Sequence, residues 1–328
     1  LIRSDDSKTF DTKFLNFERD FFENDSLGLI ADNSKLFSPD EQLQTPNDVA
    51  NLVMKSSRVV CLSGAGISVE SGIPPFRNMN PTNDSTSTSS VAIWSEFDPN
   101  LMTVQGFNSN PEIVREWWRM KHTYLPRISS AQPNPAHSFF SYLQSLNKLN
   151  SIITQNIDSL HSRSGVSPER IIELHGHMRG LICSNNSSSK YNPIPYGDGQ
   201  CSFACSEENC VEKNYFQNDP TPQCPKCQSP LRTETVMFGQ PVPSEDLKRA
   251  IEIISNCDLL FIIGSSLIVH PVNTLPLIAQ KAGIPIVMIN RDETDYDPYA
   301  TALVNQPAGE FLQAVTNCLQ EMGDRKSV

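Results

Sequence analysis

Three small residues, Gly64, Ala65 and Gly66, follow an apolar run and precede a short stretch of helical character. Glycines let a backbone approach a pyrophosphate, and a helix N-terminus supplies N–H donors for it. The usual dinucleotide fingerprint places Gly or Ala where Val69 stands, and an acidic residue about 20 positions on, where this chain has a Ser- and Thr-rich loop. The loop alone is equally compatible with a phosphate cradle and with an ordinary strand–helix turn.

Other apolar runs of the chain also end in small or polar residues. Gly264, Ser265 and Ser266 end the run at 258–266, and Asn290 ends the run at 284–290. Asn290 could contact a ribose that the missing acidic residue would otherwise bind. Two small-residue strand ends in one sheet favour a nucleotide site.

His175 is the candidate general base. It follows the apolar run 170–174 and precedes a glycine, and we expect it to face Asn156 and Asp158. An imidazole has a pKa near neutral pH, which suits proton abstraction from a hydroxyl. Two other histidines compete for this role. His177 leads into a Cys-rich segment, and His161 is expected at a solvated helix end.

Five of the nine cysteines lie between Cys201 and Cys227. Cys205 and Cys210 form one pair, and Cys224 and Cys227 form a C-x-x-C pair. Four thiolates predict a closed, structural zinc site that is not catalytic. Cys183 or Cys201 could replace a member of the first pair. An odd, clustered set of cysteines is typical of a reducing compartment.

These residues must be positioned by alternating strands and helices. Strands are expected at 58–64, 151–158, 170–176, 258–266 and 284–290, and helices at 47–57, 111–125, 134–147, 244–255, 272–281 and 310–320. Continuous apolar strands that alternate with helices are typical of a parallel sheet covered on both faces. Ligands bind such sheets at the carboxyl ends of the strands. The predicted fold is therefore α/β, a Rossmann-like parallel sheet with helices on both faces and a small inserted zinc-binding lobe.

The expected organisation is a large domain with one insertion. Residues 1–46 are predicted to form a peripheral arm, 47–177 and 236–320 the Rossmann-like nucleotide-binding domain with a helical sub-lobe at about 74–135, 178–235 the zinc-binding lobe, and 321–328 a tail.

The net charge of −11 argues against nucleic-acid binding through a broad basic face. No apolar run approaches the roughly 20 residues that a membrane span needs, and no signal-peptide pattern opens the chain. We therefore expect neither nucleic acid nor membrane as a partner. An intracellular, reducing compartment is expected, with the cytoplasm or nucleus favoured over the mitochondrion.

Five motifs, in this order, resemble the sirtuin family of NAD-dependent protein-lysine deacylases over roughly residues 47–320: "GAGISVESGIPPFR", "TQNIDSLH", "ELHG", the paired cysteines, and "GSSLIVHPVN" followed by "IVMIN". The resemblance implies two cofactors, NAD and one structural zinc ion, and acylated-lysine proteins or peptides as substrate. It also implies that the acyl oxygen attacks the nicotinamide ribose, that nicotinamide leaves, and that His175 and Asn156 are the catalytic residues. The products would be free lysine, nicotinamide and O-acyl-ADP-ribose.

The resemblance assigns further residues to the site. The NAD-binding residues that it implies are Ser63, Gly64, Ala65, Gly66, Ser68, Ile73, Phe76, Arg77, Gln155, Asn156, Ile157, Asp158, Gly264, Ser265, Ser266, Asn290 and Arg291. The substrate would add as an extended strand, and the substrate-binding residues implied are Val236, Met237, Phe238, Gly239 and Val269. "GIPPFR" would act as a lid that shields the activated ribose from water.

Several positions depart from the usual pattern of the family. Pro75 replaces the common Asp, Gln240 replaces Glu, and residues 184–204 form a long extra stretch. Trp118 and Lys121 stand where relatives selective for acidic acyl groups carry Tyr and Arg, so acetyl or longer apolar acyl groups are expected. Alternatives on the same site are an NAD glycohydrolase and a mono-ADP-ribosyltransferase, and a non-catalytic NAD-binding scaffold is less favoured.

Overall fold

The structure is a computed structural model of the chain, and it describes residues 36–75, 97–206 and 221–324. A six-stranded sheet forms its centre, in the order β3-β2-β1-β7-β8-β9, and every neighbouring pair is parallel. The strands are β1 (Val59–Ser63), β2 (Leu149–Thr154), β3 (Ile171–Glu173), β7 (Leu259–Ile263), β8 (Ile286–Ile289) and β9 (Ala302–Val304). The order reverses between β1 and β7, as in doubly wound dinucleotide-binding folds. The predicted fold class is confirmed.

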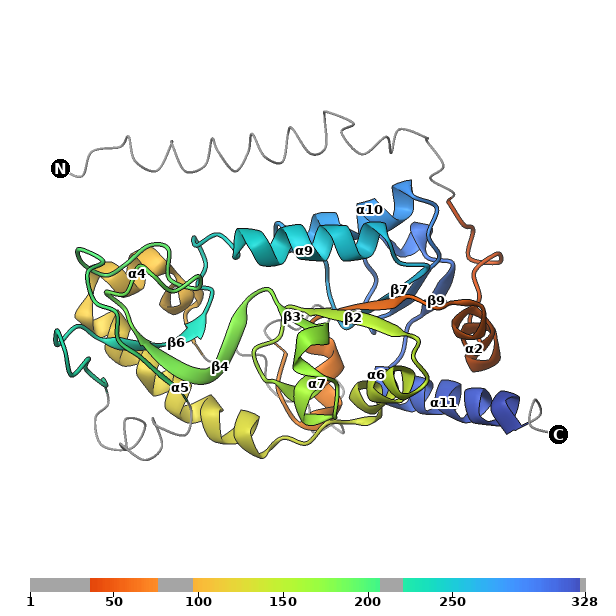
Figure 1. The fold of residues 1–328 in the computed structure, drawn as a ribbon, viewed down its shortest axis with the longest axis horizontal. Helices are drawn as coiled ribbons and strands as arrows, with labels where there is room; N and C mark the ends of the chain where they lie inside the picture. The colour runs from red at the N-terminus through yellow and green to blue at the C-terminus, as the bar shows by residue number, and fades with distance from the viewer. Residues whose placement is uncertain (1–35, 76–96, 207–220, 325–328) are drawn as a thin grey trace.

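Helices cover both faces of this sheet (Figure 1). One face carries α2 (Pro46–Lys55), α6 (Pro135–Ser145) and α11 (Ala308–Asp324), and the other carries α9 (Ser244–Ser255) and α10 (Leu275–Lys281). Strand β1 shows why both faces are apolar. Val59 and Cys61 pack in the cluster under α2, α6 and α11, whereas Val60 and Leu62 pack under α9 and α10. Alternate side chains of a strand point to opposite faces, so a strand covered on both sides must be apolar throughout.

The start of α6 also holds the glycine-rich loop after β1. Asn134 caps the helix by accepting a hydrogen bond from the Ala136 N–H. Its amide nitrogen donates to the Ile67 carbonyl at 2.7 Å and to the Ser71 hydroxyl at 3.0 Å. Both residues belong to the short 3-10 helix η1 (Ala65–Ser71). A capping residue thus fixes the loop to the start of α6.

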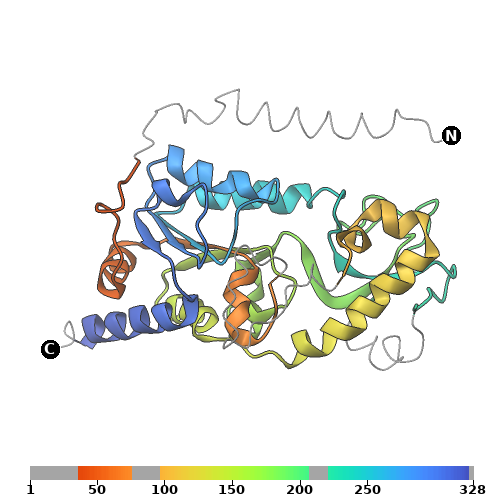
Figure 2. The same cartoon turned by 180° about the vertical axis from the view of Figure 1, so that it is seen from behind.

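A second, smaller lobe lies at the other end of the molecule from the C-terminal end of α11 (Figures 1 and 2). Its three-stranded antiparallel sheet has the order β5-β4-β6, from β4 (Gly176–Cys183), β5 (Ala204–Ser206) and β6 (Leu231–Thr235). It packs against α4 (Val104–Ser109) and α5 (Pro111–Ser130) in one apolar cluster with Trp117 and Trp118 at its centre. The helical segment that the sequence assigns to the large domain therefore shares its core with the small lobe.

Some expected elements differ from the structure at their ends. The predicted strand 170–176 divides into β3 and β4, because Gly176 adopts a left-handed φ of +76° and turns the chain toward the small lobe. The predicted strand 151–158 ends at Thr154, so Asn156 and Asp158 lie in the loop that follows β2. Strand β9 was not expected. It is only three residues long, too short for a periodic signal.

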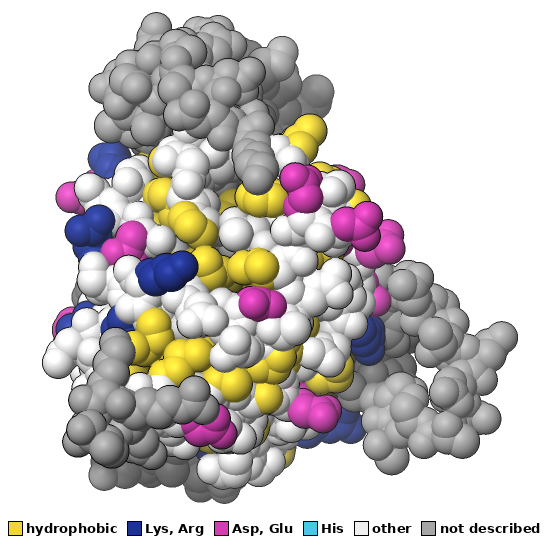
Figure 3. Space-filling view, turned by 90° about the vertical axis from the view of Figure 1, so that its right-hand side faces the viewer, with side chains coloured by type: hydrophobic (Ala, Val, Ile, Leu, Met, Phe, Trp, Pro, Cys, Tyr) yellow, Lys and Arg dark blue, Asp and Glu magenta, His cyan; other side chains and the backbone are white. Residues whose placement is uncertain are grey.

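The described residues nearest the N-terminus lie along the outer edge of the large sheet. Leu43 bridges to Ala302 of β9. The buried side chain of Gln42 donates to the carbonyls of Asp297 and Ala300. Viewed from the side of α2 and α11, basic and acidic side chains are scattered among short apolar patches (Figure 3). Among the described helices, none is both long and apolar enough to cross a membrane.

Candidate active site

The carboxyl ends of β1 and β7 meet where the strand order reverses, and their two loops pack backbone against backbone. The Gly64 N–H donates to the Ile263 carbonyl at 2.9 Å, and the Gly66 N–H donates to the Gly264 carbonyl at 2.8 Å. A Cβ on Gly66 would lie 2.5 Å from the Gly264 Cα. Gly264 has φ +61°, and a Cβ there would lie 2.2 Å from the Ile67 nitrogen. These glycines are required for the contact of the two loops, before any phosphate is considered.

Asn156 lies under the same loop. Its amide nitrogen donates to the Gly64 carbonyl at 3.1 Å and to the Ser68 hydroxyl at 3.2 Å. Ser68 in turn donates to Asp158 at 2.7 Å, and Asp158 also accepts from the Leu160 N–H. Burial raises the pKa of Asp158, and these two hydrogen bonds oppose the shift. The set fixes Asn156 and η1 relative to each other.

His175 lies just before β4, with its ring against the loop that follows β2. Its Nδ1 lies 3.1 Å from the Gln155 carbonyl. A carbonyl only accepts, so this hydrogen bond requires the proton on Nδ1 and leaves a lone pair on Nε2. Burial lowers the pKa of His175 below its ordinary value of 6.5, and the bond to Gln155 acts in the opposite direction. At neutral pH the ring is therefore an uncharged base.

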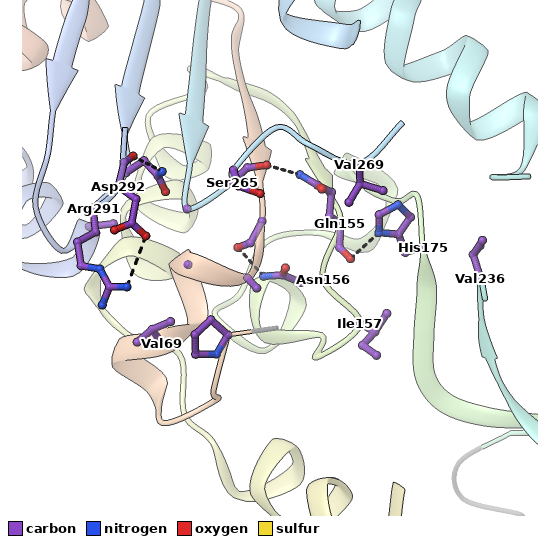
Figure 4. Close-up of a pocket in the computed structure, with 18 of the residues that line it drawn as sticks. Val69, Gln155, Asn156, Ile157, His175, Val236, Ser265, Val269, Arg291 and Asp292 are labelled. Carbon is purple, nitrogen blue, oxygen red and sulfur yellow. Dashed lines mark hydrogen bonds and ion pairs between the residues drawn. The ribbon is translucent and has the colours of Figure 1, made fainter. Parts of the chain in front are cut away.

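A cavity of about 370 Å³ joins these groups. Gln155 holds one wall, since its amide nitrogen donates to the Ser265 hydroxyl at 2.8 Å. The cavity extends from His175 and Val236 at one end to Arg291 and Asp292 at the other (Figure 4). The predicted site residues that line it are Gly64, Ala65, Gly66, Gln155, Asn156, Ile157, His175, Val236, Met237, Phe238, Gly239, Gly264, Ser265, Ser266, Val269, Asn290 and Arg291.

Asn290 is held in place at the far end of the cavity. Its amide nitrogen donates to the Asp292 carbonyl at 2.6 Å, and its own carbonyl accepts from Asn305. Arg291 forms an ion pair with Asp292 at 3.5 Å. This end is therefore polar and carries charges of both signs.

The segment after β6 forms the wall opposite the glycine loops. The Val236 N–H donates to the His175 carbonyl at 2.9 Å, which joins this wall to the backbone of the candidate base. The Phe238 N–H donates to the Met102 carbonyl, and the Phe238 carbonyl accepts from the Val104 N–H. The side chain of Phe238 is 40% exposed. An accessible apolar side chain on an ordered backbone suits contact with a peptide.

Four predicted NAD-binding residues lie behind the cavity rather than among its lining residues. Ser68 and Asp158 orient Asn156 as described. Ser63 bonds to the Thr154 hydroxyl, and Ile73 packs on Ala131 and Leu160. Two further predicted residues, Phe76 and Arg77, lie outside the described residues, although Pro75 just before them lines the cavity.

Sequence reasoning missed several lining residues. Gln306, Pro307 and Ala308 lie at the carboxyl end of β9, and recognition of that short strand would have predicted them. The others that were not predicted are Val69, Glu70, Met102, Thr235, Gln240, Val242, His270, Ile289, Asp292 and Glu293. Glu70 also accepts a hydrogen bond from the Gly309 N–H at the start of α11.

The prediction that His161 ends a solvated helix is wrong. Its ring is 3% exposed, bonds through Nε2 to the Ser63 hydroxyl, and lies 5.0 Å from the ring of His137. Burial, and then the neighbouring His137, keeps the pKa of His161 well below its ordinary value. This histidine supports the loop from below and does not line the cavity.

Four cysteines of the small lobe form a candidate metal centre. Their sulfur atoms all lie within 4.8 Å of one another, and the cysteines are Cys183, Cys201, Cys224 and Cys227. The sulfurs of Cys183 and Cys227 are 3.4 Å apart, near the roughly 3.8 Å separation in a tetrahedral site with Zn–S bonds of about 2.3 Å. Backbone N–H groups of Asn185 and Lys226 donate to two of the sulfurs, and hydrogen bonds of this kind orient the ligands of a metal ion. The group therefore fits zinc.

This group corrects the predicted ligand set. Cys224 and Cys227 belong to it, but Cys205 lies in β5 outside the group, and Cys210 lies outside the described residues. The long stretch after Cys183 folds back on itself through the Asn186–Gln200 bridge, and the Cys183 N–H donates to the Phe203 carbonyl. Backbone pairing thus returns Cys201 to Cys183 across a long loop that spacing alone could not predict.

Comparison with known proteins gives a consistent result. The model of the Sir2 family matches residues 64–271. NAD-dependent protein deacetylase 1 of Pyrobaculum aerophilum is 34% identical over 276 residues, which cover 84% of this chain and 95% of that protein. NAD-dependent protein deacylase 2 of Archaeoglobus fulgidus is 33% identical over 279 residues, 84% of this chain and 97% of the relative.

Solved structures agree with these sequence matches. One described under "Structural Basis for the Mechanism and Regulation of Sir2 Enzymes" superposes with a TM-score of 0.68 at 33% identity, covering 87% of this chain and 100% of the other. A Sir2 structure with a p53 peptide and NAD⁺ gives a TM-score of 0.66 at 30% identity, with 84% and 98% covered. A Sir2 structure bound to a propionylated peptide gives the same values.

Proposed function

The chain belongs to the Sir2 family, and we infer from this membership that it is an NAD-dependent protein deacylase whose reaction takes place in the cavity at the ends of β1 and β7. The observation that carries the assignment is the cavity itself. It brings together the two glycine-rich loops that meet where the strand order reverses, the uncharged imidazole of His175, and the segment 236–239. A nucleotide and an acylated side chain can therefore meet beside one base.

NAD would lie across the strand ends. Its pyrophosphate would meet the N–H groups of Gly64, Ala65 and Gly66 and the hydroxyls of Ser265 and Ser266. Asn290 would contact the adenosine ribose. The nicotinamide end would reach Gln155, Asn156 and Ile157. Bound there, NAD supplies an electrophilic ribose carbon and nicotinamide as leaving group.

The chain's own residues would then orient the reactants and move one proton. Asn156, held by the Gly64 carbonyl and Ser68, has little freedom to turn and would position the nicotinamide end. His175 would accept a proton on Nε2 from a ribose hydroxyl, which would make that oxygen nucleophilic toward the acyl carbon. The Gln155 carbonyl would stabilise the imidazolium that forms, because it accepts a hydrogen bond from the Nδ1–H group.

The partner would be a protein or peptide that carries an acylated lysine. Two related structures contain peptides, one of them propionylated. The substrate peptide would be bound along residues 236–239 and past Val269, by backbone pairing that selects little for the sequence of the peptide. The four-cysteine centre would hold zinc as a structural ion with no open position, in a reducing compartment that keeps its thiols free.

The experiment combines the protein, NAD and an acetyl-lysine peptide, and measures nicotinamide together with the mass of the peptide. We expect nicotinamide release and loss of the acetyl group only when the acetylated peptide is present, with the unmodified peptide as control. Equal nicotinamide release without peptide would instead identify an NAD glycohydrolase. Transfer of ADP-ribose to protein would identify a mono-ADP-ribosyltransferase. An absence of nicotinamide release would identify a non-catalytic NAD-binding scaffold.

Apolar acyl groups are the proposed preference. Lys121 is 3% exposed, lies 4.8 Å over the ring of Trp117, and is not among the lining residues of the cavity. Burial, and then Arg232, lowers the pKa of Lys121 to about 7, so this amine is a poor partner for an acidic acyl chain. The acyl chain would instead contact Met102, Ile157 and Val269. A panel of acetyl, butyryl and succinyl peptides tests this, and a faster succinyl reaction would contradict it.

A further inference from the structure

Asn192 belongs to the extra stretch 184–204 and is 1% exposed. Its amide nitrogen donates to the carbonyls of Ser184 and Asn186, at 2.8 and 2.9 Å. Its amide oxygen accepts from Arg232 at 3.0 Å and lies 3.4 Å from the amide nitrogen of Gln240. A buried side chain with partners on both its donor and acceptor atoms has one orientation. Asn192 therefore ties the extra stretch to β6 and to the segment after it.

Arg232 is a buried cation whose hydrogen bonds, within the described part of the chain, all go to neutral oxygens. Besides Asn192, the acceptors are the carbonyls of Tyr191, Thr233 and Thr235 and the amide oxygen of Gln240. Burial lowers the pKa of Arg232 to about 9, so the guanidinium remains charged at pH 7. A buried guanidinium that loses one hydrogen-bond acceptor is left with an unpaired N–H group, which costs folding free energy unless the side chain moves to another acceptor. The position of Arg232 therefore depends on each of these acceptors.

Gln240 connects Arg232 to the wall of the cavity. Its amide oxygen accepts from both Arg232 at 3.2 Å and the Met237 N–H at 3.1 Å, and the Gln240 N–H donates to the Met237 carbonyl. Gln240 and Met237 both line the cavity. Arg232 also holds the Thr235 carbonyl, one residue before the wall segment begins. The turn of residues 236–240 is thus held by the same guanidinium that Asn192 fixes.

We propose that Asn192 is a positioning residue for the acylated peptide, which acts through Arg232 and Gln240 to hold residues 236–240 against the cavity. The inference rests on the proposed function. It gives the extra stretch a role in peptide binding that is separate from closing the metal centre, and it leaves the NAD half of the cavity independent of Asn192.

The test measures KM for an acetyl-lysine peptide, KM for NAD and kcat in the full chain with zinc bound. Asn192→Leu keeps the approximate volume but removes the acceptor for Arg232. We expect the peptide KM to rise about tenfold, with the KM for NAD within about twofold of the wild type. Asn192→Asp keeps an acceptor for the guanidinium and should hold the peptide KM within about threefold. A merely structural role would lower the melting temperature of both variants without this difference in peptide KM.

Ser187→Ala is the matched control in the same stretch. The Ser187 hydroxyl donates to the Gly199 carbonyl and not to the Arg232 network, so the peptide KM of this variant should stay at the wild-type value. If Asn192→Leu fails to fold, Asn192→Ser replaces it, because the shorter hydroxyl cannot reach Arg232. A peptide KM within twofold of the wild type in the folded variant would overturn the proposal, as would an equal rise in Ser187→Ala. Failure of the wild-type chain to release nicotinamide would instead refute the proposed function.

Discussion

The two walls of the cavity are held in place by different means. The glycine-loop wall is the edge of a parallel sheet, with buried apolar side chains on both faces and backbone contacts between the ends of β1 and β7. The peptide wall follows β6 in a three-stranded sheet whose far end depends on four cysteines and a buried polar network. The first wall is stabilised by the core of the domain itself. The second is conditional on a metal ion and on polar contacts between distant segments.

The largest effect is expected from removal of the metal, to which the two walls should respond differently. Chelation of zinc, or Cys224→Ser, should unfold the small lobe, because structural zinc contributes about 10–16 kcal/mol of folding free energy in small domains. Hydrogen exchange should then accelerate in β4, β5 and β6, while the amides of β1, β2 and β7 stay protected, and deacylation should be lost.

Cys318→Ser is the control for this comparison, since Cys318 lies on α11 outside the metal group. It should retain zinc and activity. Equal loss of protection in both sheets would show that the walls are one cooperative unit.

The next effect concerns the base that joins the walls. His175→Ala should lower kcat by about 10²- to 10⁴-fold, the usual contribution of general base catalysis, and leave the melting temperature nearly unchanged. Single-turnover deacylation measures this. The control His122→Ala alters a histidine of α5 that does not line the cavity, and its turnover should match the wild type. Normal turnover in His175→Ala would refute the assigned role.

Two glycines with similar backbone angles test the packing of the first wall. Gly264 (φ +61°) meets backbone atoms at 2.2 Å, whereas Gly283 (φ +66°) has nothing within 4 Å of an added Cβ. Gly283→Ala should cost about 1–2 kcal/mol of unfolding free energy for the left-handed conformation alone. Gly264→Ala should cost about 2–5 kcal/mol, because overpacking adds a further 1–3 kcal/mol or so to that strain, and it should also raise the KM for NAD. Urea denaturation distinguishes them, and equal losses would contradict the close contact.

The smallest effect is a shift in pH dependence. Only the neutral imidazole of His175 can accept a proton, and burial lowers its pKa below 6.5. The base therefore stays active at lower pH than an exposed histidine would. The acid limb of kcat/KM for the peptide should have its midpoint below pH 6.5, and a midpoint above 6.5 would contradict this environment.

The same contrast explains what could be predicted from the sequence. Parallel strands place their carboxyl ends at one edge, so Gly64, Asn156, His175 and Gly264 could be brought together from the alternation of strands and helices alone. The phosphate-binding role of the glycines was predicted, but their role in packing the two loops together was not. The contact joins loops 200 residues apart, and the sequence of either loop alone does not indicate it. In the small lobe, Cys201 joins Cys183 through a long loop closed by backbone pairing and by Asn192. Spacing favours near neighbours, so it selected Cys205 and Cys210.

The most direct test of the proposed deacylation measures the products of one reaction together. The protein, NAD and an acetyl-lysine peptide are incubated, and nicotinamide, deacetylated peptide and O-acetyl-ADP-ribose are quantified at several times. We expect the three products to form in equal amounts, and His175→Ala to suppress deacetylated peptide and O-acetyl-ADP-ribose together. Deacetylated peptide that forms without NAD, or with free acetate in place of O-acetyl-ADP-ribose from the earliest time, would contradict it.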